Sequence, residues 1–372
     1  MKSALFVFGT RPEAIKLAPL VLRFKEDPHF VTQVCVTGQH REMLDQVLAF
    51  FGIVPDFDLN LMKPNQTLFD ITAEGLKGLQ AVIATAKPDL LVVQGDTTTA
   101  FIGALAGFYT QTKVAHVEAG LRSGQKQSPF PEEINRIMAG HLADFHFAPT
   151  PKAKANLACE NIHKDVWVVG NTVIDALFLG LEKIKQNESQ YASFFAQQNI
   201  DFSQKIILVT GHRRESFGKP FEEFCLALKT LADTLENTSI VYPVHLNPNV
   251  QEPVFRILGN HTRIHLIDPL PYPHLLWLLN ACQLVITDSG GIQEEAPALG
   301  KPVLVTRTVT ERTEGIDAGT AKLIGTNPTQ IVAEATRLLT DSAAYAAMAT
   351  AVNPYGDGTT CTQILNLIKE HL

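Results

Sequence analysis

The sequence has few cysteines and few long apolar runs. Its five cysteines are scattered along 372 residues, and no two of them form a Cys-x-x-Cys pair. An odd and dispersed set argues against a disulfide framework and is typical of proteins from a reducing compartment. No apolar run approaches the length of about 20 residues that a membrane-spanning helix needs. We therefore expect a cytoplasmic protein that does not bind a membrane.

Two ligand-binding signatures are also missing. The first expected strand runs into Gly9-Thr10-Arg11-Pro12-Glu13, and no Gly-x-Gly-x-x-Gly follows it. That motif is the usual mark of a tightly bound dinucleotide, so we expect no NAD. No set of cysteines and histidines has the spacing of a zinc site. We predict an enzyme or binding protein that needs neither a cofactor nor a metal.

The charge balance restricts the partners. The formal net charge is −7, which argues against non-specific binding to nucleic acid. An anionic substrate would then need a locally positive site. Arginines, lysines and histidines that gather in particular loops are therefore the ones to follow.

The pattern of apolar segments predicts the fold class. Short apolar strands alternate with helical stretches almost throughout, as in parallel sheets that are covered on both faces. The expected strands are 4–8, 32–36, 90–93, 114–117, 145–148, 166–168, 206–209, 240–242, 264–266, 284–286, 303–305 and 321–324. The expected helices are 13–24, 41–51, 68–85, 98–109, 132–142, 152–158, 221–234, 274–280, 329–339 and 360–372.

These elements indicate an α/β protein with two Rossmann-like, doubly wound domains that face a cleft. We expect the first domain to comprise residues 1–169 plus 355–372 and the second to comprise residues 170–354. A turn-rich hinge at 353–358 would let the last helix return to the first domain. The polar stretch 186–204 is expected to be the join or a surface element. Ligands of such sheets bind beyond the carboxyl ends of the strands.

One strand end has the character of a phosphate site. The strand 284–286 leads into Ser289-Gly290-Gly291, where a helix is expected to begin. Glycines let a ligand approach the main chain, and the free N–H groups of a helix start favour an anion. Glu294 and Glu295 follow one turn later and would accept bonds from hydroxyl groups. The combination favours a phosphate linked to a sugar, although a tight turn capped by Asp or Ser would give the same local pattern.

Other strand ends carry two chemical groups. Basic side chains that could neutralise a diphosphate are Arg11, Lys16, His212, Arg213, Arg214 and Arg312. Carboxylates follow strands of the first domain or begin its helix at 132, and they are Asp96, Glu118 and Glu132. Carboxylates beside an anionic ligand would repel it, so their presence indicates a role in proton transfer.

Each of these residues also has a simpler interpretation. Arg11 could pair with Glu13, and Asp96 could cap the helix that begins at Thr98. His116, between alanine and valine, is expected to be an interior histidine with its hydrogen bonds satisfied. Glu132 could simply match the helix dipole, which is worth about 0.3–1 kcal/mol. The concentration of charge at the carboxyl ends of both sheets favours the functional interpretation.

Seven motifs, in order and in both predicted domains, resemble those of the bacterial non-hydrolysing UDP-N-acetylglucosamine 2-epimerases. They are Gly9-Thr10-Arg11-Pro12-Glu13, Thr37-Gly38-Gln39-His40, Gln94-Gly95-Asp96, Glu118-Ala119-Gly120-Leu121-Arg122-Ser123, Pro131-Glu132-Glu133-Ile134-Asn135-Arg136, Gly211-His212-Arg213-Arg214-Glu215 and Asp288-Ser289-Gly290-Gly291-Ile292-Gln293-Glu294-Glu295. The resemblance implies a GT-B-like architecture and a cytoplasmic homodimer that takes part in cell-surface polysaccharide biosynthesis. It also implies interconversion of UDP-N-acetylglucosamine and UDP-N-acetylmannosamine.

The resemblance assigns roles to particular residues. It implies that the catalytic residues are Asp96, Glu118, Glu132 and His212. It implies that the UDP portion is held by Arg11, Lys16, Ser289, Gly290, Gly291, Glu295 and Arg312. A second UDP-N-acetylglucosamine can act as an activator in this family, and the matching positions are Gln39, His40, Gln66, Arg213 and His245. It implies no metal, no cofactor and no nucleic-acid partner.

Three other functions compete with this one. A GT-B-type glycosyltransferase would need an acceptor site and would not need all three carboxylates. A hydrolysing 2-epimerase usually carries a kinase domain as well, which 372 residues cannot hold. A sensor that only binds a UDP-sugar would bind the anion more easily without the carboxylates. We expect the epimerase, acting by elimination of UDP to 2-acetamidoglucal and its re-addition.

Overall fold

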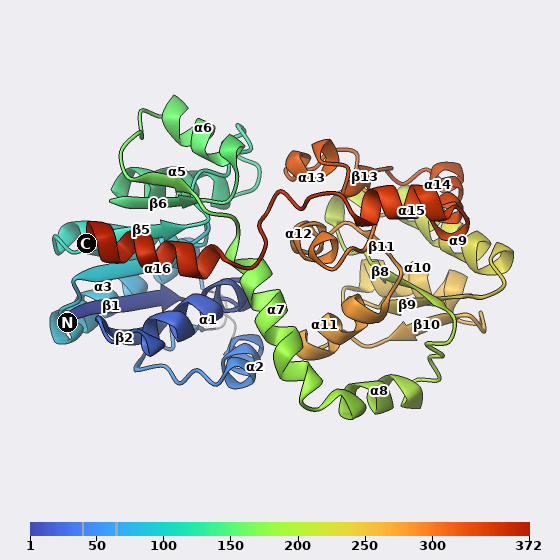
Figure 1. The fold of residues 1–372 in the computed structure, drawn as a ribbon, viewed down its shortest axis with the longest axis horizontal. Coiled ribbons are helices and arrows are strands. Elements are labelled where there is room, and N and C mark those ends of the chain that lie inside the picture. The colour runs from blue at the N-terminus through green and yellow to red at the C-terminus, as the bar shows by residue number, and fades with distance from the viewer. Residues whose placement is uncertain (39–40, 64–65) are drawn as a thin grey trace. The chain divides into compact units, whose positions relative to one another are not determined.

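The computed structural model describes residues 1–38, 41–63 and 66–372 and divides into two compact units. Unit 1 comprises Met1–Leu179 and Tyr355–Leu372, and unit 2 comprises Gly180–Pro354 (Figure 1). The chain passes from unit 1 to unit 2 within helix α7, Thr172–Lys185. The boundary expected from the sequence, after residue 169, lies just before this helix.

Unit 1 is a parallel sheet with helices on both of its faces. Its strand order is β3-β2-β1-β4-β5-β6-β7. The strands are β1 Lys2–Phe8, β2 Phe30–Val36, β3 Phe57–Asp58, β4 Leu90–Gln94, β5 Lys113–Val117, β6 Phe145–Ala148 and β7 Val166–Val168. The helices are α1 Arg11–Glu26, α2 Arg41–Phe51, α3 Leu68–Ala86, α4 Thr98–Tyr109, α5 Glu132–Leu142, α6 Pro151–Cys159 and α16 Thr360–His371.

Unit 2 repeats this architecture. Its strands are also parallel, in the order β10-β9-β8-β11-β12-β13. They are β8 Lys205–Thr210, β9 Thr238–Pro243, β10 Ile264–Ile267, β11 Leu284–Thr287, β12 Val303–Val305 and β13 Ala321–Leu323. The helical segments are α8 Glu188–Gln197, the 3-10 turn η1 Arg214–Ser216, α9 Lys219–Thr234, α10 Pro248–Leu258, α11 Tyr272–Ala281, α12 Gly290–Ala298, α13 Thr313–Asp317, α14 Pro328–Thr340 and α15 Ser342–Ala349.

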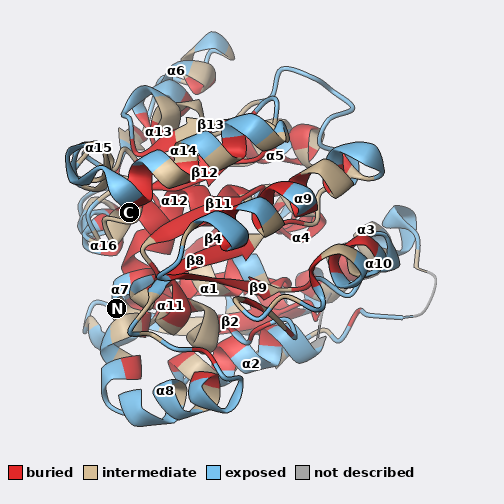
Figure 2. Ribbon diagram, turned by 90° about the vertical axis from the view of Figure 1, so that its right-hand side faces the viewer, coloured by how far each residue is buried: buried red, intermediate tan, exposed pale blue. Residues whose placement is uncertain are grey.

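The cores lie between the sheets and their helices. In unit 1, Leu5 and Val7 of β1 are fully buried and belong to one core cluster with Leu79 of α3 and Ile102 of α4. Figure 2 shows the strands as buried ribbons and the outward faces of the helices as exposed. Both faces of each sheet are covered, which explains why the strands are continuous apolar runs rather than alternating ones.

The strand orders fix where a ligand can bind. Each sheet winds outward in both directions from one pair of neighbouring strands, β1 and β4 in unit 1 and β8 and β11 in unit 2. The carboxyl ends of such a pair form the topological switch point, where ligands of doubly wound sheets bind. The predicted site residues of the two units follow these four strands or their near neighbours.

The last helix belongs to unit 1, as expected. Helix α16 contacts α1, and Lys369 Nζ lies 2.9 Å from Asp27 Oδ2. At its start, the N–H of Cys361 donates to Asp175 Oδ1 at 2.8 Å, and the Thr360 hydroxyl donates to the Val169 carbonyl at 2.9 Å. These bonds attach the C-terminal segment to the first turn of α7 and the residue that follows β7.

The sequence predicted no bounds for several elements, although helices were expected between the strands of the second domain. These elements are β3, α7, α8, α10, α13 and α15. Of these, α8 lies inside the polar stretch 186–204, which is therefore partly helical. In the described part of the chain, no helix is both long enough and apolar enough to span a membrane.

Candidate active site

The loop after β4 presents Asp96 at the switch point of unit 1. Asp96 does not cap α4, because Thr97 is the N-cap and its hydroxyl accepts the N–H of Ala100 at 3.0 Å. Instead, the Asp96 carboxylate forms an ion pair with Nη2 of Arg136 on α5. The amide of Asn135 also donates to the Asp96 carbonyl at 3.0 Å. The alternative that Asp96 is a capping residue is therefore wrong.

A second, buried carboxylate, that of Glu133, also pairs with Arg136. Glu133 is 1% exposed and lies 3.2 Å from Nη1 of Arg136. Its oxygens also accept the N–H groups of Ser123 and Gly124, at 2.9–3.1 Å. Arg136 is thus fixed between the buried carboxylate of Glu133 and the partly exposed one of Asp96, and α5 positions the loop that carries Asp96.

Glu118 follows β5 and is surrounded by donors. Lys16 Nζ lies 2.7 and 2.6 Å from its two carboxylate oxygens, and Asn171 Nδ2 lies 3.1 Å from Oε1. The amide of Gln94 also donates to Oε2. Each of these partners donates a hydrogen bond to Glu118. Donors favour the charged form of a carboxyl group over its neutral form.

The backbone at Glu118 is in an unusual conformation. Its φ is 63°, in the left-handed region that non-glycine residues seldom occupy. Such a conformation costs on the order of 1 kcal/mol and persists only where the surroundings impose it. The donors Lys16 of α1, Gln94 of β4 and Asn171, just before α7, supply that constraint. Backbone strain of this kind is concentrated at functional sites.

Arg11 begins α1, directly after β1. The sequence left open that Arg11 pairs with Glu13. Instead, Glu13 is 1% exposed and accepts the N–H groups of Gly9 and Thr10 at 3.1 and 2.8 Å. The Thr97 hydroxyl donates to its other oxygen at 2.6 Å. Burial raises the pKa of Glu13, and these bonds oppose that shift. Glu13 therefore joins the loop of Arg11 to the loop of Asp96.

Glu132 and His116 complete unit 1. Glu132 is the first residue of α5 and is partly exposed. His116 is fully buried, and its Nε2 donates to the carbonyl of Gly95 at 2.7 Å, which confirms an interior histidine. The expectation that its hydrogen bonds are satisfied is wrong for Nδ1, which is buried and has no partner in the part of the chain that the structure describes. Burial lowers the pKa of His116 to about 4. A neutral imidazole thus holds the loop of Asp96 through a hydrogen bond to Gly95, the residue before Asp96.

In unit 2, His212 and Arg213 follow β8 at the switch point. Their backbone N–H groups both donate to Oδ2 of Asp288, at 2.7 and 2.8 Å. Asp288 follows β11 and is 2% exposed. The ring of His212 is stacked on that of His245, with centroids 5.1 Å apart. The structure therefore brings together His212, Arg213 and His245, and adds Asp288.

The start of α12 has the geometry of an anion site. Ser289 is its N-cap but makes no side-chain cap bond, and Gly290 and Gly291 form its first turn. The carboxylate of Asp288 is committed to the loop after β8, so neither residue caps this helix in the usual way. A β-carbon at Gly290 would lie 3.5 Å from Cζ of Arg312, which places the guanidinium beside the helix start.

Carboxylates hold Arg312 in place. Its Nε donates to Oε1 of Glu294, which is 1% exposed, at 2.8 Å, and its Nη1 lies 3.3 Å from Oε1 of Glu311. Burial raises the pKa of Glu311, but Arg312 and Arg307 bring it down to about 2. Glu295 is 9% exposed, and its Oε2 would lie 3.8 Å from a β-carbon at Gly291.

The predicted second-ligand residues fall into three groups. Gln39 and His40 lie outside the described residues. Gln66 belongs to unit 1 and contacts its own loop, accepting the N–H of Lys63 at 2.9 Å. Arg213 and His245 belong to unit 2 and lie beside His212.

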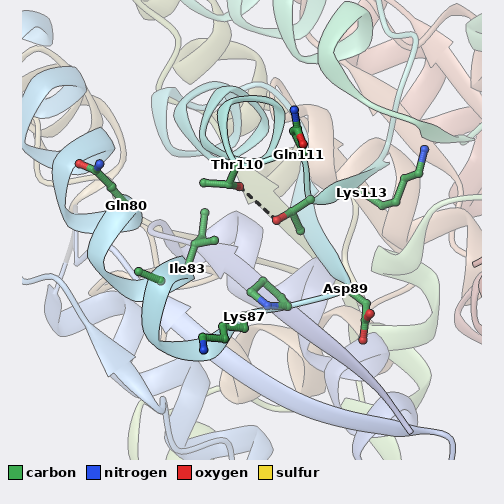
Figure 3. A pocket seen from close by; sticks show the side chains of 10 residues that line it. Gln80, Ile83, Lys87, Asp89, Thr110, Gln111 and Lys113 are labelled. Carbon is green, nitrogen blue, oxygen red and sulfur yellow. Dashed lines mark hydrogen bonds between the residues drawn. The ribbon is translucent and has the colours of Figure 1, made fainter.

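A pocket in unit 1 lies at the opposite edge of the sheet from the predicted site residues of that unit. Its volume is about 590 Å³, and it lies near the amino ends of β4 and β5 (Figure 3). The labelled side chains include Lys87, Asp89 and Lys113, and the Thr110 and Thr112 hydroxyls are 3.1 Å apart. It is lined by none of the predicted site residues. The carboxyl ends of the strands, at the opposite edge of the sheet, remain the candidate site.

Sequence reasoning missed the residues that hold the site together. Arg136 and Asp288 were quoted within motifs but were given no role, Glu13 was considered only as a partner of Arg11, and Gln94 and Asn171 were not singled out as partners. Their shared feature is burial: each is between 1% and 7% exposed. Among the described residues, no group of three or more His, Cys, Asp or Glu side chains could hold a metal ion.

Comparison with known proteins adds a family to this geometry. A family model described as UDP-N-acetylglucosamine 2-epimerase matches residues 22–369. A UDP-N-acetylglucosamine 2-epimerase of Salmonella typhimurium is 55% identical over 369 residues, covering 99% of this chain and 98% of the relative.

Solved structures agree with this result. A UDP-GlcNAc 2-epimerase from Neisseria meningitidis, bound to UDP-GlcNAc, is 45% identical, with a TM-score of 0.91 over 99% of this chain and 100% of that one. One from Methanocaldococcus jannaschii, in complex with UDP-GlcNAc and UDP, is 30% identical, with a TM-score of 0.82 over 99% of both chains. With two doubly wound parallel sheets of the GT-B-like kind and a family match along nearly its whole length, this chain belongs to the UDP-N-acetylglucosamine 2-epimerase family.

Proposed function

We propose that this protein reversibly inverts carbon 2 of UDP-N-acetylglucosamine to give UDP-N-acetylmannosamine, without releasing free sugar. The observation that carries the proposal is the pair of carboxylates in unit 1, Asp96 and Glu118, each in contact with a basic side chain. A protein that only binds a nucleotide diphosphate has no use for two such groups at a switch point. The relatives' names give the substrate class.

The chemistry follows from the weak acidity of the hydrogen on carbon 2. No carbonyl is adjacent to that carbon, so a carboxylate cannot remove the proton directly near neutral pH. When the bond from carbon 1 to the diphosphate oxygen breaks, carbon 1 becomes cation-like and the neighbouring hydrogen becomes acidic. The electrons of the C–H bond form the double bond of 2-acetamidoglucal, and UDP leaves with the electrons of the C–O bond.

The carboxylates of unit 1 would manage the proton. A carboxylate accepts it from carbon 2 during elimination, and an acid returns a proton to the opposite face before UDP adds again. Acid and base groups are therefore needed on both faces, and Asp96, Glu118 and Glu132 supply them. General acid or base help of this kind is worth about 10²–10⁴ in rate for each group. Lys16 would hold Glu118 ready to accept a proton.

Unit 2 would stabilise the departing UDP. The start of α12 at Ser289, Gly290 and Gly291 offers N–H groups to the diphosphate, and Arg312 lies beside it. Glu295 would accept bonds from the ribose hydroxyls. Protonated His212 would donate to the leaving oxygen, which is most valuable when charge develops there. Arg11, at the start of α1, would add positive charge to the same diphosphate.

The products separate this proposal from its rivals. We would incubate the purified protein with UDP-N-acetylglucosamine alone and follow the anomeric signals by NMR. The proposal predicts a mixture of UDP-N-acetylglucosamine and UDP-N-acetylmannosamine with no free sugar. Free N-acetylmannosamine and UDP in equal amounts would indicate a hydrolysing epimerase. An unchanged substrate would contradict the proposal and would favour a transferase or a sensor.

We further propose that the enzyme is a cytoplasmic homodimer and that a second UDP-N-acetylglucosamine activates it. The support is the resemblance together with the grouping of Arg213 and His245 beside His212. Initial rates of the reverse reaction, measured with UDP-N-acetylmannosamine alone, should rise when traces of UDP-N-acetylglucosamine are added. Rates that do not respond would remove the activator from the account.

A further inference from the structure

The strongest unassigned feature of the molecule is the buried carboxylate of Asp288. It lies at the switch point of unit 2, directly after β11, and its side chain is 3% exposed. One oxygen, Oδ2, accepts the backbone N–H groups of His212 and Arg213 at 2.7 and 2.8 Å. This oxygen fixes the loop after β8 to the end of β11.

The other oxygen is directed at the imidazole. Asp288 Oδ1 lies 3.5 Å from Nδ1 of His212. Within the described part of the chain, this buried oxygen has no hydrogen-bond partner. A buried carboxylate oxygen without a partner is costly, and a donor on the His212 ring would relieve that cost. The His212 side chain is 41% exposed, so the far side of the ring is open to a ligand.

We infer that Asp288 is a positioning residue that orients the His212 ring and stabilises its protonated form. The bond to the loop backbone sets where His212 lies, and Oδ1 sets how its ring is turned, with Nδ1–H facing inward and Nε2 facing outward. The role of this arrangement in turnover rests on the function proposed above, whereas the arrangement itself does not.

The proton balance of this arrangement is simple. His212 in its protonated form carries hydrogens on both ring nitrogens. As the bond from carbon 1 to oxygen breaks, the Nε2 proton passes to the leaving diphosphate oxygen, and His212 becomes neutral with its remaining hydrogen on Nδ1. On re-addition the proton returns. Asp288 neither gives nor takes a proton in this step and changes only the stability of the imidazolium.

The other groups around the ring oppose its protonation. The His245 ring is stacked on it with an interplanar angle of 12°, and Arg213 adjoins it in the chain. Burial lowers the pKa of His212, Asp288 raises it, and His245 and Arg213 lower it. The net effect on the pKa of His212 is a lowering, caused first by burial, and among these groups Asp288 opposes it.

The variant Asp288→Asn tests the inference. The asparagine oxygen can still accept the two backbone N–H groups, but its NH₂ group then faces Nδ1, where it cannot accept a hydrogen bond. We expect the titration midpoint of His212, followed by NMR of the ring hydrogens, to move to lower pH by about one unit or more, the scale of a neighbouring carboxylate. The chain has twelve histidines, so the signal is assigned with His212→Gln. An unchanged midpoint would overturn the inference.

A matched control separates orientation from simple loosening of the loop. Tyr242 holds the same loop by a different bond, because its hydroxyl donates to the Gly211 carbonyl at 2.8 Å. Tyr242→Phe should lower the melting temperature and leave the His212 midpoint in place. If Tyr242→Phe moved the midpoint as far as Asp288→Asn does, loosening of the loop would explain the effect and Asp288 would have no specific role.

A double-mutant comparison gives the kinetic readout. Asp288→Asn should lower kcat at least about tenfold in the native background, within the range of lost general acid help. In a His212→Gln background the same change should have little further effect, because the group on which Asp288 acts is gone. Equal losses in both backgrounds would overturn the inference. If the native protein turned over no UDP-N-acetylglucosamine, the proposed function would fail, and the NMR titration would still decide the role of Asp288.

Discussion

In unit 1 the switch point presents two carboxylates in addition to Arg11, and the side chains that hold these carboxylates are basic: Arg136 holds Asp96, and Lys16 holds Glu118. In unit 2 the signs are reversed. There the presented group is His212 or a guanidinium, and buried carboxylates such as Asp288 and Glu294 hold it.

The contrast indicates a division of labour. Two sheets with the same winding place their loops at equivalent edges, so the fold alone does not decide the chemistry. The charge of the buried partner decides whether a loop presents a base for a sugar carbon or a cation for a phosphate. Unit 1 is therefore expected to control the rate of proton transfer, and unit 2 is expected to control the binding of UDP.

The largest effect should come from the presented carboxylates of unit 1. Asp96→Asn and Glu118→Gln should each lower kcat by about 10²–10⁴, because a neutral amide cannot accept the proton of carbon 2. The dissociation constant for UDP, measured by calorimetry, should change little. Asp144→Asn is the matched control, since Asp144 pairs with Lys113 at the amino end of β5 and should leave kcat unchanged. Near-normal rates in both site variants would show that the carboxylates of unit 1 do not carry the proton transfer.

The counterpart in unit 2 should affect binding instead. Arg312→Gln removes a charged donor from the start of α12 and should weaken UDP binding about ten- to a hundredfold, the scale of a charge-assisted hydrogen bond. Arg256→Gln, which removes an exposed guanidinium paired with Glu222 and Glu252 in the same unit, should leave the affinity unchanged. Calorimetry with UDP measures both variants. Equal affinities would show that Arg312 does not contact the nucleotide.

The smallest effect concerns two histidines with opposite surroundings. Among the described residues, no carboxylate is hydrogen-bonded to His116 in unit 1, and burial lowers the pKa of His116 to about 4. In unit 2, by contrast, His212 faces Asp288. Because the unfolded chain takes up the His116 proton near pH 6.5, stability should fall as the pH drops from there towards 4.

The slope due to His116 is on the order of 1 kcal/mol per pH unit. His116→Asn should flatten that part of the curve of unfolding free energy against pH, measured with urea. Parallel curves for the native protein and the variant would show that His116 is not kept neutral by the fold.

The sequence predicted the strands better than the other elements. A strand of a covered parallel sheet is a short apolar run, and β11, Leu284–Thr287, was expected almost to its ends. Strand β3 has two residues and no such signal. Helix α8 is largely exposed and lies in a polar stretch, and α10 begins with a proline after Asn247, where a turn is equally consistent.

In the candidate site, too, one part was predicted from the sequence and the other part was not. The loops were predicted because residues at the carboxyl ends of parallel strands must gather at one edge. The partners were not, since Arg136 and Asp96 lie 40 positions apart and Asp288 and His212 lie 76 apart. A single sequence carries no signal that pairs such residues. Only the packing of α5 against the loop after β4, and of β11 beside β8, places them together.

The most direct test of the whole account is to run the reaction in heavy water. The protein is incubated with UDP-N-acetylglucosamine in D₂O, and the hydrogen on carbon 2 is followed by NMR as UDP-N-acetylmannosamine forms. Removal of that hydrogen by a carboxylate of unit 1, with return of a solvent-derived one, predicts deuterium at carbon 2 of the product from the first turnovers. Conversion that retains the original hydrogen at carbon 2 would contradict the account.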